Sequence, residues 1–270
     1  MNEDFDHRRD GSTAMVPDGT RIYAIGDIHG RMDLLDRLLQ DIAADAAYAP
    51  YEAAASNEAD ASNEESPPKR IVIVFMGDLI DRGPDSKGVV ERISAGAPAE
   101  GPLAKAQFIS LRGNHEDYII QFLADFSVAA AWLRNGGLEA IRSYVGQLPD
   151  GFIADYPALQ RLLYRAMPPS HLRFFARMPV KHVEGDYLFV HAGIRPGIPL
   201  ERQDSFDMMW IREPFLSNTE PLPKMVVHGH TLVEAPEIRP NRIAIDTGAY
   251  RSGRLTCLVL EGAGRRFIST

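Results

Sequence analysis

Cysteine and long apolar runs are what this sequence has least of. Cys257 is the only cysteine among 270 residues, so no disulfide can form within the chain and a cysteine-rich zinc site is excluded. We expect Cys257, in the apolar segment RLTCLVLE, to be a small buried side chain in a strand. No stretch reaches the roughly 18 consecutive apolar residues of a membrane-spanning helix. The first 16 residues are charged and lack a signal-peptide core, so we expect a cytoplasmic protein without a membrane partner.

Positive charge is also scarce. The chain has 29 lysines and arginines against 37 aspartates and glutamates, which gives a formal net charge of −8. Such a chain repels a phosphate polymer at long range, so nucleic acid is not an expected partner and a nucleic-acid phosphodiesterase is disfavoured. Any phosphate group must therefore be bound by a local site.

The first half of the chain alternates apolar runs with helix-like segments. RIYAIGD predicts a strand followed by a helix for which Asp33 is the candidate N-cap. IVIVFMGD and then SKGVVERIS repeat this step, with Asp85 as the candidate cap. QFISLRGN and EDYIIQFLADF repeat it again. Three strand–loop–helix steps favour an α/β fold with parallel strands.

The whole chain, residues 1–270, is expected to form one domain with two insertions. Residues 45–70 are alanine-rich and acidic without an apolar face, which predicts an exposed insertion loop. Residues 126–178 look mainly helical and predict a helical cap beside the core. The short apolar runs YLFVHAG, KMVVHGH, RIAIDTGAY and RLTCLVLE then predict a second set of strands.

Polar residues fall where five of the apolar runs end. The candidate ligands are Asp27 and His29 in GDIHG, Asp78 and Asp81 in GDLIDRG, Asn114 and His115 in RGNHE, His191 in VHAG, and His228 and His230 in VHGH. Sites in open α/β sheets form at the carboxyl ends of strands, so these loops are expected to converge. Each loop alone is typical of a turn with a capping acid, but five of compatible chemistry indicate one shared site.

The residue types indicate a metal centre. Carboxylate, imidazole and amide donors suit Mn²⁺, Fe or Zn²⁺ rather than a soft metal. About six ligands are too many for one tetrahedral zinc and suit two ions that share a bridging carboxylate. His7, His171 and His182 lack this setting and are expected to be surface or core residues.

Taken together, GDIHGR, GDLIDRGPDS, LRGNHE, HAG and HGHT resemble the signature of the calcineurin-like metallophosphoesterases, from residue 21 to about 250. The first three motifs resemble the phosphoprotein phosphatase branch, which includes serine/threonine phosphatases and bacterial symmetrical diadenosine tetraphosphate hydrolases. This resemblance implies an α/β fold of two facing mixed β-sheets flanked by helices, with a dinuclear metal site at the rim.

The resemblance also implies roles. It implies two divalent metal ions, with Mn²⁺ expected first and Fe or Zn²⁺ as alternatives, and a shared water activated to attack phosphorus in line. His115 matches the family's proton donor, and Asp81 matches the acid that orients it. His230 is preferred to His228 because the family places a ligand in the GH of the last motif. The implied ligands are Asp27, His29, Asp78 as the bridge, Asn114, His191 and His230.

Other residues have two interpretations. Arg82 matches the family's phosphate clamp, and Arg212 resembles a second clamp, although an ion pair with the next acid is an alternative. Arg112 is either a further clamp or the partner of an acid. Tyr250 either lines the pocket or packs in the core. Glu116 is expected to be a first-turn acid favoured by the helix dipole, with a supporting contact to the site as the lesser alternative.

The leading hypothesis is a metal-dependent phosphomonoesterase that acts on phosphoserine or phosphothreonine in proteins. Its close rival is the hydrolysis of dinucleoside polyphosphates such as diadenosine tetraphosphate, which can use the same metals and arginines. The substrate partner is thus a phosphorylated protein or a small phosphate ester. A catalytically inactive metal-binding scaffold is a third possibility, but every expected ligand and the proton donor are present.

Overall fold

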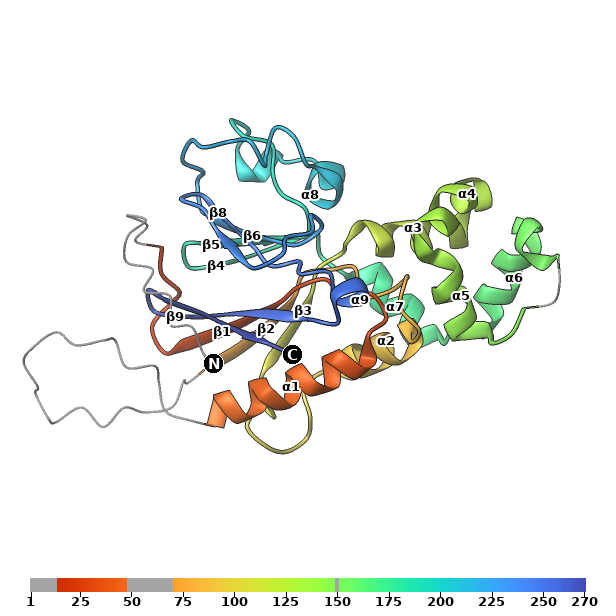
Figure 1. Cartoon of the computed structure of the whole chain (residues 1–270), viewed down its shortest axis with the longest axis horizontal. Helices are drawn as coiled ribbons and strands as arrows, with labels where there is room; N and C mark the ends of the chain where they lie inside the picture. The colour runs from red at the N-terminus through yellow and green to blue at the C-terminus, as the bar shows by residue number, and fades with distance from the viewer. Residues whose placement is uncertain (1–13, 48–69, 149–150) are drawn as a thin grey trace, which may run out of the picture.

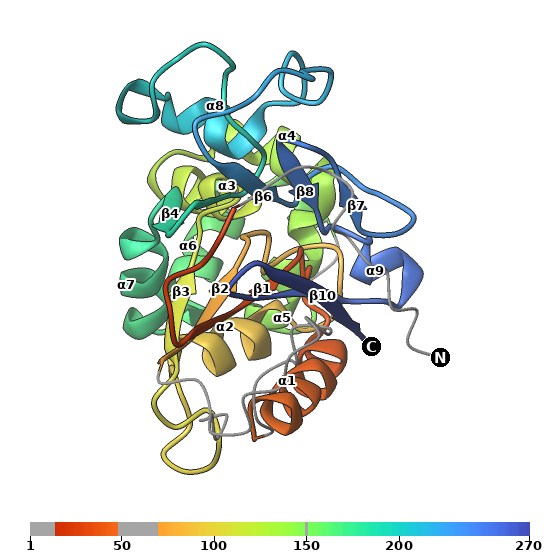
Figure 2. The same ribbon diagram turned by 90° about the vertical axis from the view of Figure 1, so that its left-hand side faces the viewer.

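The computed structural model describes residues 14–47, 70–148 and 151–270 (Figure 1). Two five-stranded sheets face each other, and helices cover their outer faces (Figures 1 and 2). The expected α/β fold of two facing mixed sheets is confirmed. The expected insertion at residues 45–70 lies outside the described residues, except for its ends in α1 (Met32–Ala47) and β2 (Arg70–Phe75).

The first sheet has the order β10-β9-β1-β2-β3. Its other strands are β1 (Thr20–Ile25), β3 (Gln107–Ser110), β9 (Thr256–Glu261) and β10 (Gly264–Ser269). β1, β2 and β3 are parallel because α1 and α2 (Ser86–Ser94) return the chain between them. β9 was expected in the second set of strands, but it pairs with β1 in the first sheet.

The second sheet has the order β4-β5-β6-β8-β7. Its strands are β4 (Lys181–Glu184), β5 (Tyr187–Val190), β6 (Met225–His228), β7 (Glu237–Ile238) and β8 (Arg242–Ala244). β5, β6 and β8 are parallel, and the edge strands β4 and β7 are antiparallel to their neighbours. The sequence did not indicate β4, β7 or β10, because each lies at a sheet edge and carries few buried residues.

Alternate side chains of the first sheet serve two cores. Ile22 packs between the sheets with Phe189 and Val227, whereas Tyr23 faces the helices on the other side. Cys257 is fully buried on that helical side, as expected for a small apolar residue in a strand. A third cluster covers the outer face of the second sheet and includes side chains of α8 (Ser205–Trp210).

The two expected helix caps have different outcomes. Asp85 caps α2, since its carboxylate accepts a hydrogen bond from the backbone N–H of Gly88 at 2.8 Å. Asp33 is not an N-cap: α1 begins at Met32, so Asp33 lies in the first turn and pairs with Arg31 at 2.6 Å. An acid in the first turn still interacts favourably with the helix dipole.

Residues 126–178 are mainly helical, and we call them the helical cap. They contain α4 (Ala129–Trp132), a π turn at Leu133–Gly137, α5 (Leu138–Val145), α6 (Tyr156–Ala166) and α7 (Pro169–Arg177). α3 (Asn114–Ala124) leads into them from the site, and Figure 1 shows the group beside the sheets. Trp132 of α4 is fully buried with its ring 5.0 Å from that of Phe122 in α3, which fixes α4 beside the site.

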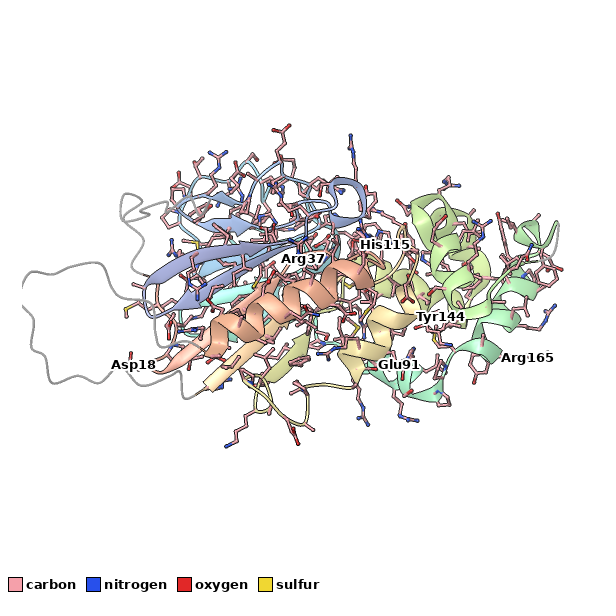
Figure 3. All side chains as sticks on the ribbon, turned by 60° about the horizontal axis from the view of Figure 1, so that its bottom comes forward. Asp18, Arg37, Glu91, His115, Tyr144 and Arg165 are labelled. Carbon is pink, nitrogen blue, oxygen red and sulfur yellow. The ribbon has the colours of Figure 1, made fainter. Side chains whose placement is uncertain are left out.

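The histidines outside the motifs are structural or lie outside the described residues. His171 is buried in α7, where its Nδ1 accepts from the Tyr144 hydroxyl at 2.9 Å and its Nε2 donates to Glu91 at 3.0 Å. Figure 3 shows Tyr144 and Glu91 close together at this junction between α2 and the cap. His182 is half-buried on β4, and His7 is not among the described residues. No helix in the described ranges is both long and apolar enough to cross a membrane.

Replacing Phe189 by alanine should lower the free energy of unfolding by about 3–5 kcal/mol, because it leaves a cavity between the two sheets. Urea denaturation would measure the change. Val183→Ala on β4 is the control: its side chain is 43% exposed, so its effect should stay within about 0.5 kcal/mol. A loss for Phe189→Ala as small as that of the control would contradict the packing described here.

Candidate metal centre

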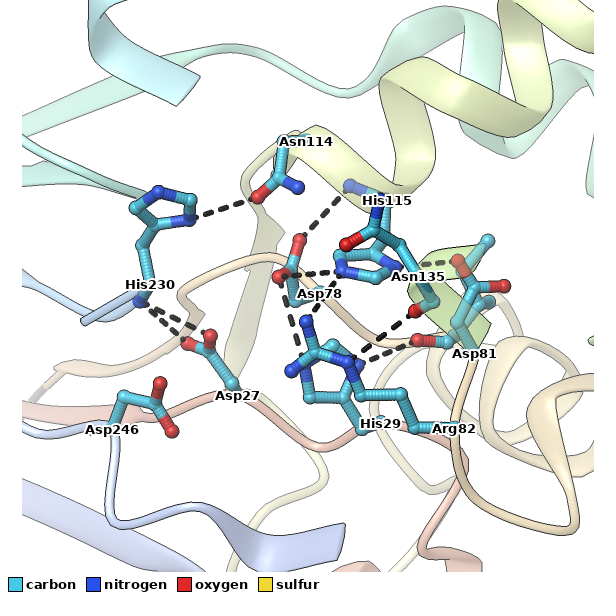
Figure 4. A network of polar contacts seen from close by, with 12 residues as sticks. Asp27, His29, Asp78, Asp81, Arg82, Asn114, His115, Asn135, His230 and Asp246 are labelled. Atoms are coloured by element: carbon cyan, nitrogen blue, oxygen red, sulfur yellow. Dashed lines mark hydrogen bonds and ion pairs between the residues drawn. The ribbon is translucent and has the colours of Figure 1, made fainter. Parts of the chain in front are cut away.

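The predicted ligands come together at one edge of the two sheets (Figure 4). They follow the carboxyl ends of β1, β2 and β3 in the first sheet and of β5 and β6 in the second, as the strand-end argument predicts. Each of these side chains is buried except that of His230, which is partly buried. The residues brought together are Asp27, His29, Asp78, Asp81, Asn114, His115, His191 and His230.

The backbone of this site is strained. Within the described ranges, the non-glycine residues with positive φ are His29, Asp78, Asp81, Arg82 and His230, with φ between 47° and 74°. All of them are predicted site residues. A left-handed conformation costs roughly 1–3 kcal/mol for such residues, and it persists only where the surroundings enforce it. The surrounding structure thus holds these loops in strained conformations, and these conformations position the side chains of the site.

Two glycines let the loops after β2 and β3 touch. Gly77 has a φ of 93°, and a Cβ there would lie 2.6 Å from the backbone N of Gly113. A Cβ on Gly113 would in turn lie 2.2 Å from Oδ1 of Asp78. Only residues without a side chain allow this approach, which brings Asn114 beside Asp78.

Four atoms with lone pairs to donate to a metal face one another in one half of the site. Nδ1 of His191 donates to the carbonyl of Met76 at 2.9 Å, which leaves a lone pair on Nε2 in the neutral ring. This Nε2 lies 3.0 Å from Oδ1 of Asn114 and 3.2 Å from Nδ1 of His230, and it is 3.3 Å from Oδ1 of Asp78. A divalent cation at this point would be coordinated by the lone pairs of all these atoms at once.

The other half has the same design. Nδ1 of His29 donates to the carbonyl of Ile80 at 2.8 Å, so its Nε2 carries a lone pair in the neutral ring, and this Nε2 lies 3.6 Å from Oδ2 of Asp78. Asp78 belongs to both groups of side chains whose donor atoms lie within 4.8 Å of one another, one with His29 and His115 and one with His191 and His230. One carboxylate shared by two groups is the arrangement expected of a bridging ligand.

Buried negative charge is concentrated beside these rings. Burial raises the pKa of Asp27 well above its ordinary value, and the carboxylates of Asp246 and Asp78 raise it further. Burial also raises the pKa of Asp246, whose carboxyl group contacts that of Asp27 (Figure 4). The sequence did not single out Asp246, because it follows the apolar run of β8 without a histidine or asparagine nearby. Three close buried carboxylates require compensating positive charge, so these residues fit a pair of divalent ions.

His115 lies on the His29 side of Asp78, and an acid holds its ring in place. Its Nδ1 donates to Oδ2 of Asp81 at 2.5 Å, while its Nε2 lies 3.7 Å from Oδ2 of Asp78. Burial alone lowers the pKa of His115, but the carboxylates of Asp78 and Asp81 outweigh burial and raise it above its ordinary value. Trp132 of the helical cap donates from Nε1 to the same oxygen of Asp81 at 2.7 Å. No sequence motif predicts this contact, because Trp132 lies in a segment without motifs.

The candidate phosphate-binding residues lie at the opening of the site. The Arg82 guanidinium is 2.9 Å from Nε2 of His29 and 3.1 Å from Nε2 of His115, and it lies 4.7 Å from the centroid of the Tyr250 ring. The Tyr250 ring meets that of His29 edge-on at 5.2 Å, so it lines the site. Arg212 is exposed, and its charge contributes to the lowered pKa of His230, after burial and His191.

Two alternative interpretations of the arginines find no support. Among the described residues, no hydrogen bond or ion pair engages the side chain of Arg212, so the ion pair with the following acid is absent there. Arg112 does not reach the site: its guanidinium points to α7 and donates to the carbonyl of Phe175 at 3.5 Å.

Glu116 lies in the first turn of α3, as expected, and it also makes the supporting contact that was the lesser alternative. It is fully buried, and its carboxylate accepts hydrogen bonds from the backbone N–H groups of Asp78, Leu79 and Gly113, each at 2.8 Å. Burial and the charge of Asp78 raise its pKa to about 7. The lesser alternative, a supporting contact, is therefore what the structure contains, because the close approach of the two loops leaves three donors that need one acceptor group.

His228 lies apart from the cluster of acceptors. Its Nδ1 donates to the carbonyl of Gly229 at 3.0 Å, and its ring meets that of Phe215 edge-on at 5.1 Å. Burial lowers the pKa of His228 to about 4. The preference for His230 as the ligand thus agrees with the geometry.

Comparison with known proteins agrees with this site. Residues 20–253 match the family model of the calcineurin-like phosphoesterases, and the chain belongs to that family. It is a metal-dependent phosphoesterase by membership. Serine/threonine-protein phosphatase 1 of Salmonella typhimurium is 26% identical over 240 residues, which cover 87% of this chain and 89% of that protein. The asymmetrical bis(5'-nucleosyl)-tetraphosphatase PrpE of Bacillus thuringiensis is 26% identical over 208 residues, 71% of this chain and 76% of that protein.

Solved structures share the fold. A cold-active protein-tyrosine phosphatase of a psychrophilic Shewanella species is 16% identical with a TM-score of 0.53, over 94% of this chain and 83% of that one. A proposed diadenosine tetraphosphatase is 19% identical with a TM-score of 0.58, over 96% of this chain and 95% of that one. At these identities the similarity concerns the fold alone.

Replacing Glu116 by glutamine should weaken metal binding by about 10- to 100-fold, because one amide oxygen cannot accept from three backbone donors. The manganese affinity would be measured by equilibrium dialysis with elemental analysis. Asp117→Asn, on the same helix but bonded only to Gln121 in the structure, is the matched control and should bind manganese normally. Equal affinity in the two variants would show that the loops keep their places without Glu116.

Proposed function

We propose that this protein hydrolyses phosphomonoesters with two divalent metal ions and with His115 as the general acid. The observation that carries the proposal is the position of His115, whose Nδ1 is fixed by Asp81 while its Nε2 points toward the shared carboxylate Asp78. A proton donor beside a metal bridge suits a reaction in which a basic leaving group departs from phosphorus.

The metal ions would be held by the side chains that face one another as acceptors. We assign His29 and Asp78, whose donor atoms lie close together, and Asp27, which accepts from the backbone N–H of His230, to one ion. Asp78, His191 and His230, which also lie close together, and Asn114, which faces both histidines, are assigned to the other. When bound, the ions supply Lewis-acid activation of water and of the phosphoryl group. We propose Mn²⁺ first, with Fe or Zn²⁺ as alternatives, because these donors do not discriminate among the three. A cytoplasmic location is also proposed on the sequence alone.

The protein residues supply the proton and hold the substrate. His115 would carry its proton on Nε2 toward the leaving oxygen, and Asp81 would stabilise the imidazolium through Nδ1. Trp132 keeps Oδ2 of Asp81 in place by sharing it. Arg82 and Arg212 would bind phosphate oxygens that face away from the metals, since a guanidinium can donate two parallel hydrogen bonds. A complete set of such residues argues against an inactive scaffold.

The proposed substrate class is phosphoserine or phosphothreonine in proteins. The Salmonella relative, which bears the name of a serine/threonine-protein phosphatase, matches over 87% of this chain. Dinucleoside polyphosphates are the second candidate, because tetraphosphatases are also among the relatives. Both classes would use the same metals and arginines and would differ in what holds the rest of the substrate.

Replacing His115 by asparagine should lower turnover of a substrate with an alkoxide leaving group by about 10²- to 10⁴-fold, because no proton reaches that oxygen. The loss should be much smaller for p-nitrophenyl phosphate, whose leaving group needs no proton. Steady-state rates on both substrates and the manganese content would be measured. His182→Asn is the control and should change neither. Unchanged turnover of the alkoxide substrate at normal manganese content would remove His115 from the mechanism.

A direct comparison of substrates tests the substrate class. With manganese present, kcat/KM for a phosphoserine peptide should exceed that for diadenosine tetraphosphate if the first candidate holds. Release of phosphate from the peptide and of nucleotides from the tetraphosphate would be followed under the same conditions. A strong preference for the nucleotide would overturn the protein-phosphatase assignment and leave the phosphoesterase chemistry intact.

A further inference from the structure

One turn of the helical cap lies against the loop that follows β2. The turn is the π-helical segment Leu133–Gly137, and the loop contains Asp81 and Arg82. The backbone N–H of Arg82 donates to the carbonyl of Gly136 at 3.1 Å, and its Nε donates to the carbonyl of Asn135 at 3.4 Å (Figure 4). The cap therefore holds both the backbone and the side chain of the candidate phosphate clamp.

The contact with Gly136 supports an unfavourable backbone conformation. Asp81 and Arg82 are consecutive non-glycine residues with positive φ, of 74° and 64°. Such conformations persist only where neighbouring groups hold them. The N–H of Asp81 donates to the hydroxyl of Ser86 at 2.9 Å, and the N–H of Arg82 donates to the Gly136 carbonyl. Without that carbonyl, the backbone of Arg82 would relax.

The turn approaches Arg82 this closely because residue 136 is glycine. Gly136 has a φ of 100°, and a Cβ there would lie 2.6 Å from Cγ of Arg82 and 2.8 Å from its backbone N. A larger residue would therefore push Arg82 away from the turn. Trp132, directly before the turn, is bonded through Nε1 to Asp81, so the turn has little freedom to move away instead.

The contact with Asn135 determines which groups of Arg82 face the site. Because Nε is bonded to the Asn135 carbonyl, the two terminal amino groups are directed at the site, 2.9 Å from Nε2 of His29 and 3.1 Å from Nε2 of His115. The Tyr250 ring covers the guanidinium at 4.7 Å. Two parallel N–H groups in this orientation are what a guanidinium uses to bind two oxygens of one phosphate group.

We propose that the turn Leu133–Gly137 is a positioning element for phosphate binding, and that Gly136 acts on the substrate through Arg82. This inference rests on the proposed function, in which Arg82 binds phosphate oxygens. A guanidinium makes two bonds to a phosphate group only when it is correctly aimed, so a small displacement of Arg82 weakens binding. The affinity for phosphate is then set partly by a turn whose Asn135 is 53 residues further along the chain than Arg82.

Replacing Gly136 by alanine should raise the dissociation constant of inorganic phosphate about tenfold, as expected when a hydrogen bond to a charged group is misaligned. With manganese present, binding would be measured by equilibrium dialysis with radiolabelled phosphate, and the manganese content should stay normal. KM for p-nitrophenyl phosphate should rise by a similar factor, with a smaller change in kcat. Unchanged phosphate affinity in the folded variant, or an effect confined to kcat, would overturn the proposal.

Gly151→Ala is the matched control. Gly151 also lies in the helical cap and has a positive φ, of 76°, but a Cβ there would meet no atom within 4 Å. The substitution thus introduces a similar backbone strain without a contact to Arg82. Its phosphate affinity and its KM should equal those of the unmodified protein.

A double-mutant cycle distinguishes positioning from a general loss of structure. Arg82→Ala should weaken phosphate binding by more than about tenfold. Adding Gly136→Ala to Arg82→Ala should have no further effect, because the turn acts only through the arginine. An equal loss from Gly136→Ala in both backgrounds would show a structural role alone and would overturn the proposal.

Asn135→Ala is a milder second variant. Asn135 is exposed, and its Nδ2 donates to the carbonyl of Ala131 at 2.9 Å, which holds the residue whose own carbonyl accepts from Arg82. Its loss should weaken phosphate binding about two- to tenfold. If circular dichroism shows that Gly136→Ala does not fold, Asn135→Ala decides, and a phosphate affinity equal to that of the unmodified protein would overturn the proposal.

The outcomes separate this inference from the proposed function. If Arg82→Ala weakens phosphate binding and the folded turn variants do not, the inference fails and the proposed function stands. If no phosphate ester is hydrolysed but phosphate binding depends on Arg82 and on Gly136, the proposed function fails and the positioning role stands. Normal phosphate binding by Arg82→Ala would overturn both the clamp and the inference.

Discussion

The compensation of buried negative charge is the constraint on which this molecule depends. Asp27, Asp78 and Asp246 meet at one sheet edge, where burial disfavours their charged forms. Imidazole nitrogens and an amide oxygen face the same space, and a divalent cation can be bound by all of them at once. Cations are the solution that fits the chemistry, and the remaining features of the site serve to keep these groups close despite their repulsion.

The backbone also helps to keep these groups close together. The left-handed residues at the loop corners, the contact between Gly77 and Gly113, and the three donors collected by Glu116 all oppose relaxation of the loops. The core between the two sheets supplies the rigidity, since β1, β5 and β6 are buried along their whole length and β2 over its last four residues. The packing of the core thus holds the loops in a strained arrangement that they would not adopt alone.

The sequence predicted the parts of this structure that depend on local pattern. The parallel strands, the cap Asp85 and the gathering of the candidate ligands at strand ends follow from periodicity and from residues placed just after apolar runs. The strand Thr256–Glu261 was assigned to the wrong sheet because an apolar run does not say which neighbour it pairs with.

The unpredicted parts of the site depend on contacts between distant segments. Asp246 contacts Asp27 although more than two hundred residues separate them in the sequence, and Trp132 of α4 donates to Asp81 in the loop after β2. The burial of Glu116 is visible only once the loops after β2 and β3 are known to touch. Such residues have ordinary sequence surroundings, and they become recognisable only in three dimensions.

The hydrogen bond from Trp132 to Asp81 has a consequence for protein engineering. The orientation of His115 is set partly by a helix that carries none of the five motifs. Transplanting the motifs onto another scaffold of the same sheets would therefore transfer the candidate metal ligands but leave the Asp81 carboxylate free to turn. Exchanging helical segments between relatives would then change the orientation of the His115 ring while leaving the candidate ligands in place. The orientation of His115 and the binding of metal can therefore change independently of each other.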